Sequence, residues 1–451
     1  MTESPTKHHY LLQGPLLVRN VIWNLLGTGS PLLVAFVSIP ILIHRLGTDR
    51  FGVIALAWTL IGYAGLFDLG LGRALTKLVS EKLGSGRQEE IPELFWTSQT
   101  MMMALGLVGA AIFALGSHLL VYGILKIPIA IRSDALYSFY ALAVSIPVVI
   151  STAGLRGFLE AQQAFGLINL VRTPMGIFTF AGPLLVLPFS NHIFPITVVL
   201  VAGRIAGWMA HLLLCFRVSS ALAGELAVRP QHIGSLFSLG GWMTVSNVVG
   251  PLMLYIDRFV IGALVSTAAV TYYATPYEVV TKLLIVSGAV SAVMFPAFSL
   301  SSAQDRHRLG TLYRSTTLYL LALLLPLTGV LIAIARPGLS LWLGPDFSMH
   351  SYRIAQLLLV GTLALAVGAL PFALLQGLGR PDIPAKLNLV ELPFYAVALY
   401  WLIQTYGVTG AAVAWMLRAS IDAGLLIVLA HWIGRNPSPQ VAGLPVESVI
   451  L

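Results

Sequence analysis

Ile168–Pro174 reads INLVRTP and Leu387–Pro393 reads LNLVELP, so one seven-residue phrase occurs twice in this chain of 451 residues. A second pair of matching words lies upstream of the two copies. The word ALAV occurs at Ala141–Val144 and again at Ala364–Val367, each time shortly before a proline. Two matches in the same order indicate a duplicated half. In a membrane protein, a duplicated half is typical of a transporter whose halves move around one substrate site.

The composition is that of a polytopic membrane protein. Hydrophobic residues make up 57% of the chain and charged residues 10%, against roughly 25% charged residues in an average soluble domain. Apolar runs close to the ~20 residues that cross a bilayer recur along the whole length. Twelve spans are predicted, at residues 20–43, 51–69, 95–121, 135–154, 174–189, 193–215, 236–263, 276–297, 315–335, 354–375, 388–403 and 409–433. The prediction is an all-α membrane protein of about twelve transmembrane helices in two pseudo-symmetric six-helix bundles.

The excess of positive charge follows the predicted topology. The net charge is +8, and Lys and Arg concentrate in the loops on the side of the N-terminus. This is the positive-inside pattern, which predicts that both termini are cytoplasmic. The basic residues therefore need no nucleic acid as a partner. The first apolar run is too long for the core of a cleaved signal peptide and is expected to be retained.

The twelve spans divide into two halves of six. The predicted boundaries are a cytoplasmic N-terminal tail at 1–17, an N-terminal bundle at 18–216, a cytoplasmic linker at 217–234, a C-terminal bundle at 235–434 and a cytoplasmic tail at 435–451. Six spans in each half give both copies the same orientation across the membrane.

Ionisable residues inside the apolar runs are the candidate functional residues. Each costs about 2.5–3.5 kcal/mol at the centre of a helix, so it normally faces a partner or water. Asp257 and Arg258 are neighbours in the seventh span. They point about 100° apart on a helix, so at least one must look toward another helix or into a cavity. Glu278 and Lys282 are four apart in the eighth span, where an internal ion pair is the alternative to a binding role.

Three further groups of charges belong to the same set. Arg418 and Asp422 are four apart in the twelfth span, whereas Arg204 in the sixth span has no acid three or four residues away. Arg204, Arg418 and Asp422 are structural or secondary candidates. In Phe67–Lys82, FDLGLGRALTKLVSEK, Asp68 ends the apolar part and Arg73 and Lys77 share one face. An anion would explain this repelling pair, and a solvated helix end is the alternative. Arg19 lies near the inner end of the first span.

The chain carries no enzyme signature. It has no phosphate-binding Gly-x-x-x-x-Gly-Lys-Ser/Thr loop and no His-Glu-x-x-His zinc helix. The single cysteine, Cys215, can form neither an internal disulfide nor a metal cluster. We therefore expect no catalytic residue, no cofactor and no metal. Gly203–Gly207 has the GxxxG spacing, which is typical of helix packing.

Six phrases, in order between about residues 18 and 433, resemble a known family. They are Phe67–Arg73 (FDLGLGR), Arg156–Leu170 (RGFLEAQQAFGLINL), Tyr255–Gly262 (YIDRFVIG), Leu341–Phe347 (LWLGPDF), Leu375–Pro381 (LQGLGRP) and Gly407–Arg418 (GVTGAAVAWMLR). The sequence resembles the Wzx-type flippases of lipid-linked oligosaccharides in the multidrug/oligosaccharidyl-lipid/polysaccharide exporter superfamily. The resemblance implies two six-helix bundles around a central cavity. It also implies transfer of undecaprenyl-pyrophosphate-linked sugar units across the bacterial inner membrane by alternating access.

The implied partners are the lipid-linked oligosaccharide, the bilayer, a coupling H⁺ or Na⁺, and the polysaccharide polymerase and chain-length machinery that act on the exported unit. For the pyrophosphate we expect Arg258 and Lys282 as contacts, with Arg73 and Arg19 helping at the inner mouth. For ion coupling we expect Asp257, Glu278 and Asp68.

Two other functions are open. An ion-coupled multidrug or organic-cation antiporter of the same superfamily would need a site dominated by acids and aromatic rings. A membrane polysaccharide polymerase or ligase would need a large outer loop with catalytic residues, and the predicted outer loops are short.

Overall fold

The computed structural model is helical almost throughout, and its described part contains no strand. The backbone is described at residues 14–64, 68–224, 228–230, 233, 252–291, 294, 298, 306–378, 380 and 382–435. Within these ranges, the side chains of 14–30, 63–64, 306–308, 377 and 433–435 lie outside the description. The described residues form two compact units, Met1–Pro251 and Leu252–Leu451. The predicted tails fall largely outside the described residues, and the predicted linker at 217–234 is described only in part, so these boundaries stay predictions.

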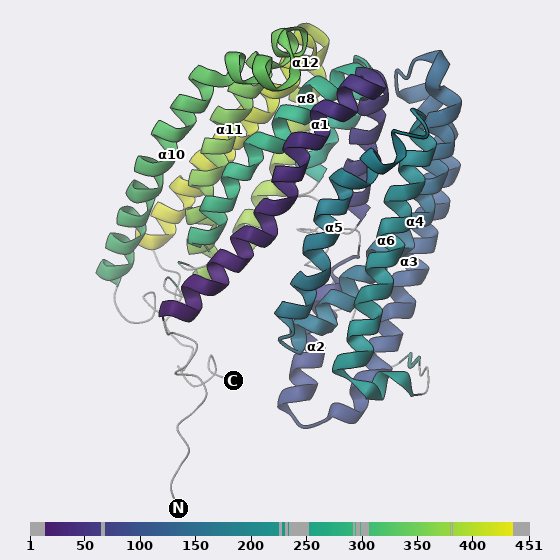
Figure 1. Ribbon diagram of the computed structural model, residues 1–451. Coiled ribbons are helices and arrows are strands. Elements are labelled where there is room, and N and C mark those ends of the chain that lie inside the picture. The colour runs from purple at the N-terminus through teal and green to yellow at the C-terminus, as the bar shows by residue number, and fades with distance from the viewer. Residues whose placement is uncertain are drawn as a thin grey trace, which may run out of the picture. The chain divides into compact units, whose positions relative to one another are not determined.

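The first unit packs its helices around α4. Its helices are α1 (Gly14–Ala64), α2 (Leu71–Gly84), α3 (Ile91–Leu119), α4 (Arg132–Ala161), α5 (Phe165–Val186) and α6 (Ile193–Val218). Figure 1 shows α3, α4 and α6 as long neighbouring rods. Helix α4 contacts all five of the others, and α5 packs between α1 and α6.

The second unit is arranged around α11. Residues 252–264 form a helix, followed by α8 (Thr267–Val280), α10 (Arg306–Leu343), α11 (Pro345–Gly377) and α12 (Asp382–Arg435). Helix α11 contacts α8, α10 and α12, and Figure 1 shows it between α10 and α8.

The repeated words fall at equivalent places in the two units. The ALAV words lie in α4 and in α11, the central helix of each unit, and the phrases INLVRTP and LNLVELP lie in the helix that follows. Pro147 and Pro371 lie inside α4 and α11. The prediction of an all-α membrane fold built from a duplicated half is therefore confirmed.

Two helices contain glycine turns that separate predicted spans. Helix α1 holds the predicted spans 20–43 and 51–69 and turns at Gly47, where φ is 79° and ψ is 165°. Helix α12 holds the spans 388–403 and 409–433 and turns at Gly407, where φ is 60° and ψ is −141°. Only glycine reaches such angles without steric cost. Seven helices of the described part are long and apolar enough to cross a membrane.

The outward faces of these helices are apolar. Leu33 in α1, Leu115 in α3 and Leu341 in α10 are 74%, 84% and 92% exposed. Apolar surface of this extent is rare on a soluble monomer and is what lipid chains cover. Together with the span lengths, it identifies a multi-pass membrane protein.

The Asp68 side chain caps the start of α2, and the helix then packs closely against α4. The Asp68 carboxylate accepts hydrogen bonds from the backbone N–H groups of Gly70 and Gly72, at 2.9 and 3.0 Å. These bonds satisfy donors that the first turn of a helix leaves open. The Thr76 hydroxyl lies 3.0 Å from the Gly157 carbonyl oxygen of α4. A Cβ atom at Gly157 would lie 2.4 Å from the Gly72 carbonyl oxygen, so the two backbones pack without a side chain between them.

The GxxxG spacing in α6 serves helix packing, as predicted. A Cβ atom at Gly203 would lie 2.5 Å from the Phe178 ring, and one at Gly207 would lie 2.9 Å from the Met175 sulfur. Both neighbours belong to α5. Cys215 is buried in the first unit's core beside α4, as expected for a small apolar residue.

We predict that Gly157→Ala lowers the stability of the protein by about 1–3 kcal/mol, because the added methyl group must separate α2 from α4. Thermal unfolding of the detergent-purified protein measures the loss. Gly329→Ala in α10 is the matched control, because its Cβ atom would meet nothing within 4 Å. Equal melting temperatures for the two variants would contradict the close contact.

Candidate functional site

Asp257 and Arg258 are buried in the helix at 252–264, and both find partners on α8. Asp257 is 0% exposed and Arg258 is 2% exposed. The Tyr273 hydroxyl donates a hydrogen bond to the Asp257 carboxylate. The Arg258 guanidinium lies 2.9 Å from the Glu278 carboxylate, measured from Nη2 to Oε1. Of the two predicted surroundings, another helix or a cavity, both residues thus have the first.

Aromatic rings complete the surroundings of Arg258. Its guanidinium carbon lies 5.4 Å from the ring centre of Tyr255 and 4.8 Å from that of Tyr277. Such contacts attract a cation, and the attraction strengthens when water is excluded. The Lys282 ammonium lies 3.6 Å from the second oxygen of Glu278. Glu278 therefore joins one buried cation and one half-exposed cation, and the i, i+4 ion pair foreseen as an alternative is present.

The local structure of α8 places these charges. Pro276 has no N–H group, so the Tyr272 carbonyl one turn earlier loses its usual partner. The Ser351 hydroxyl of α11 donates to that carbonyl at 3.0 Å. Beyond Val280 the helix tightens into a 3₁₀ turn at Thr281–Leu283, which carries Lys282. A stretch of 3₁₀ geometry inside a long helix often marks a functional position.

A second polar group lies within α12, across its turn at Gly407. We call Glu391, Tyr395, Arg418 and Asp422 the α12 quartet. Glu391 and Arg418 are each 8% exposed, and Tyr395 is 3% exposed. The Arg418 guanidinium carbon lies 5.5 Å from the Tyr395 ring centre. Both Glu391 oxygens, the Tyr395 hydroxyl and two Arg418 nitrogens have no hydrogen-bond partner among the described residues.

The two groups of the second unit are electrostatically connected. The Asp257 carboxylate interacts electrostatically with the Arg418 guanidinium. The Trp415 ring, which is fully buried, packs edge-on against Tyr277 with ring centres 5.4 Å apart. The helix at 252–264, α8 and α12 thus share one buried polar interior.

The first unit gathers cations instead. Arg156 in α4 interacts electrostatically with Asp68, Glu160 and Arg172. Arg204 in α6 interacts with Arg156, and it donates a hydrogen bond of 3.2 Å to the Thr179 hydroxyl of α5. We call Arg73, Arg156, Arg172 and Arg204 the arginine group; Asp68 interacts with both Arg73 and Arg156.

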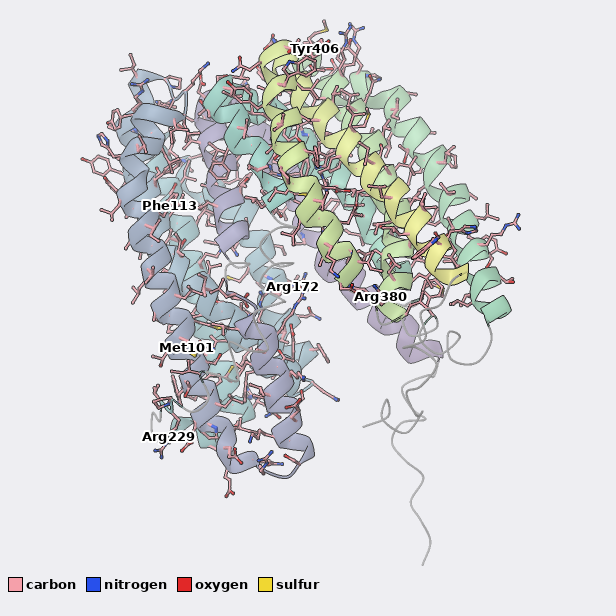
Figure 2. All side chains as sticks on the ribbon, turned by 180° about the vertical axis from the view of Figure 1, so that it is seen from behind. Met101, Phe113, Arg172, Arg229, Arg380 and Tyr406 are labelled. Carbon is pink, nitrogen blue, oxygen red and sulfur yellow. The ribbon has the colours of Figure 1, made fainter. Side chains whose placement is uncertain are left out.

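The members of the arginine group differ in exposure. Arg73 and Arg172 are exposed, and Arg156 and Arg204 are half-buried. Figure 2 labels Arg172 away from the end of the unit that Arg229 marks. The four arginines, which lie in α2, α4, α5 and α6, give this part of the first unit a positive charge that can bind an anion.

The predicted site residues separate by unit. The second unit brings Asp257, Arg258, Glu278 and Lys282 together and connects them to Arg418. Asp422 lies beside Arg418, but no ion pair joins the two among the described contacts. The first unit brings together Asp68, Arg73 and Arg204. The Arg19 side chain lies outside the described residues.

Three charged residues of these groups are absent from the predicted set. Arg156 and Arg172 fall between the predicted spans 135–154 and 174–189, yet they lie in α4 and α5. Glu391 stands in the repeated phrase LNLVELP, where the first copy has Arg172. That reversal of charge between two copies of one phrase was the available signal. No group of three metal-binding side chains occurs in the part of the chain that the structure describes.

Residues 17–302 match the family described as "Polysaccharide biosynthesis protein". The chain belongs to this family. A Shigella flexneri protein assigned as an O-antigen transporter is 30% identical over 418 residues, which are 91% of this chain and 96% of that protein. The resemblance to the oligosaccharide flippases is confirmed, and the relatives bear the names of transporters rather than enzymes.

Solved structures confirm the fold of the family. An inward-facing multidrug resistance MATE family transporter of the MOP superfamily superimposes with a TM-score of 0.74 at 13% identity, covering 90% of this chain and 96% of that one. The inward closed conformation of the lipid II flippase MurJ superimposes with a TM-score of 0.70 at 15% identity, covering 91% and 87%. The chain thus shares its helical fold with these two transport proteins.

We predict that Glu278→Ala costs about 3–5 kcal/mol of stability, because it leaves the buried Arg258 cation without its carboxylate. Lys282→Met should cost less than about 1 kcal/mol, because the Lys282 side chain is 38% exposed. Melting temperatures in detergent measure both. Replacing both partners, Arg258→Met with Glu278→Gln, should recover part of the loss. A double variant less stable than Glu278→Ala would contradict this account.

Proposed function

We propose that this protein flips an undecaprenyl-pyrophosphate-linked oligosaccharide from the cytoplasmic to the outer leaflet of a bacterial inner membrane, by alternating access. Membership of the polysaccharide biosynthesis family supports this class of cargo. The observation that carries the proposal is the arginine group of the first unit. Four arginines stand there beside the two acids Asp68 and Glu160, which leaves a clear excess of positive charge.

The chemistry of the arginine group matches the headgroup of the proposed cargo. A pyrophosphate carries at least two negative charges, and a guanidinium offers a planar fork of donors that binds phosphate oxygens in pairs. Arg172 and Arg73 are exposed and can reach a ligand without rearrangement. Arg156 is half-buried and interacts electrostatically with Arg172 and, like Arg73, with Asp68. One Arg156 nitrogen has no hydrogen-bond partner among the described residues.

The predicted contacts of the second unit receive different roles. Lys282 is partly exposed and stays a proposed pyrophosphate contact. Arg258 is covered by two tyrosine rings and bound to Glu278, so we propose that it positions Glu278 in this conformation. Asp257 and Glu278 stay the proposed ion-coupling residues.

Two further predicted residues, Asp68 and Arg19, belong to the first unit. Asp68 is also proposed for ion coupling, although its carboxylate already caps α2. Arg19 stays a proposed contact at the inner mouth.

The proposed setting follows from the cargo. We propose that both termini are cytoplasmic, which the distribution of Lys and Arg supports. A polysaccharide polymerase and its chain-length machinery would use the exported unit. H⁺ or Na⁺ is proposed as the coupling ion.

The second candidate is an ion-coupled multidrug antiporter. Its support is the similarity of fold to the MATE transporter. At 13% identity this similarity indicates the fold and not the transported substrate. An organic cation would be repelled by the arginine group, and we therefore rank this function second. A polymerase or ligase has no support from the relatives' names.

The experiment that tests the proposal follows the lipid-linked oligosaccharide in a deletion strain, using a sugar-labelling reagent that cannot cross the membrane. Without the protein, complete units should stay on the cytoplasmic leaflet, and the wild-type gene should restore their export. Normal export in a strain without a second flippase would overturn the proposal and favour the antiporter.

We predict that Arg172→Gln and Arg156→Gln each lower the flipping rate roughly 10-fold or more, because a hydrogen bond to a charged group contributes about 1.5–3 kcal/mol. The initial rate at which labelled units reach the outer leaflet measures the effect. Arg229→Gln is the control, because this exposed arginine pairs with Glu93 in the first unit, away from the arginine group. Rates equal to that of the control would contradict the assignment of the arginine group.

A further inference from the structure

The α12 quartet contains a carboxylate that nothing in the described structure binds. Glu391 is 8% exposed, and neither of its oxygens has a hydrogen-bond partner among the described residues. A buried carboxylate without a partner is among the most costly groups in a protein. Rather than stay charged in such surroundings, a carboxylate takes up a proton.

The charges around Glu391 do not balance. Its electrostatic neighbours are Asp422, which repels its charge, and Arg418, which attracts it. Two carboxylates and one guanidinium sum to a single negative charge. The Arg418 guanidinium interacts electrostatically with Glu391. Two of its nitrogens have no hydrogen-bond partner among the described residues, and neither Glu391 oxygen has one, so the two side chains do not form an ion pair. One bound proton would make the quartet neutral.

The titratable groups facing the quartet from other helices are already bonded. They are Asp257 in the helix at 252–264 and Tyr273 and Tyr277 in α8, with Arg258 and Glu278 beyond them. Asp257 accepts from Tyr273, and Tyr277 donates to the Leu254 carbonyl oxygen at 3.3 Å. Arg258 and Glu278 pair with each other. Within the described part of the second unit, Glu391 is thus the buried acid whose two oxygens both stand open.

We propose that Glu391 is a proton-binding site of the second unit, taking up a proton as a neutral carboxylic acid and releasing it to give the carboxylate opposite Arg418. The proton adds to one carboxylate oxygen and leaves from it, so the step needs no further reactant. This inference rests on the proposed function for its purpose, which is to link proton movement to flipping.

A proton fits the quartet better than Na⁺. A sodium ion needs several oxygen ligands, and the quartet offers only two carboxylates and one tyrosine hydroxyl. The Arg418 guanidinium also lies within electrostatic range, where its charge would repel a metal ion. A proton needs only one oxygen.

The internal repeat explains how the site arose. Arg172 and Glu391 hold the same position in the phrases INLVRTP and LNLVELP. In the first unit this position contributes an exposed cation to the arginine group, and in the second it contributes a buried acid. One duplicated helix therefore supplies an anion-binding residue in one copy and a proton-binding residue in the other.

Infrared difference spectroscopy of the full-length protein in liposomes tests the site directly. A step from high to low pH should produce the C=O stretching band of a protonated carboxyl group, shifted in D₂O. Glu391→Gln should remove this band, whereas Glu81→Gln should keep it, because Glu81 is 56% exposed on the surface of α2. If Glu391→Gln cannot be purified, Glu391→Asp should shift the band. A band unchanged in the Glu391 variant would overturn the proposal, as would a carboxylate change driven by Na⁺ at constant pH.

The flipping assay separates this inference from the proposed function. Glu391→Gln should flatten the dependence of the flipping rate on external pH, whereas Glu81→Gln should retain it. Flipping with a wild-type pH dependence in Glu391→Gln would overturn the inference and leave the function standing. Absence of flipping by the wild-type protein would overturn the function, while the infrared band would still report on Glu391.

Discussion

The structure of the second unit depends on one buried ion pair, that between Arg258 and Glu278. A guanidinium stays protonated at any physiological pH, and Arg258 is 2% exposed. It therefore needs a carboxylate close by, because a buried cation without one would cost the fold about 3–5 kcal/mol. That requirement holds the helix at 252–264 against α8 at a fixed register. Asp257, one position earlier, then meets Tyr273, and the shared polar interior extends through Tyr277 and Trp415 to α12.

The two units use one duplicated scaffold with different charges. Helices α4 and α11 occupy the same central place in their units, and each contains a proline shortly after the sequence ALAV. On the first scaffold, arginines gather around Arg156, with Asp68 and Glu160 as the acids beside them. On the second, Glu278 binds both Arg258 and Lys282, and Glu391 stands where the first copy of the phrase has Arg172. This division suits the flippase function that we propose, because holding an anionic headgroup and exchanging a small cation need opposite electrostatic fields.

Sequence reasoning reached the fold and part of the candidate site. Span length and hydropathy predicted the helices. The gaps predicted between spans 20–43 and 51–69 and between spans 388–403 and 409–433 contain the turns at Gly47 and Gly407. The high cost of charge in lipid identified Asp257 and Arg258 and required a partner on another helix. It did not identify Glu391, Arg156 or Arg172, because each lies near the end of an apolar run, where a charge reads as belonging to the membrane surface. Whether such a side chain turns inward depends on helices far away in the sequence.

The sequence by itself determined that this is a membrane transporter built from two copies of one bundle. Hydrophobic length, the placement of Lys and Arg, and repeated phrases are properties of the chain that need no contacts to be read. Only the tertiary structure decided which charges meet. Glu278 binds Arg258 as well as Lys282, Asp68 caps a helix, and Glu391 stands without a partner beside Arg418. Each outcome depends on which faces of separate helices pack together, and spacing along one helix does not specify that.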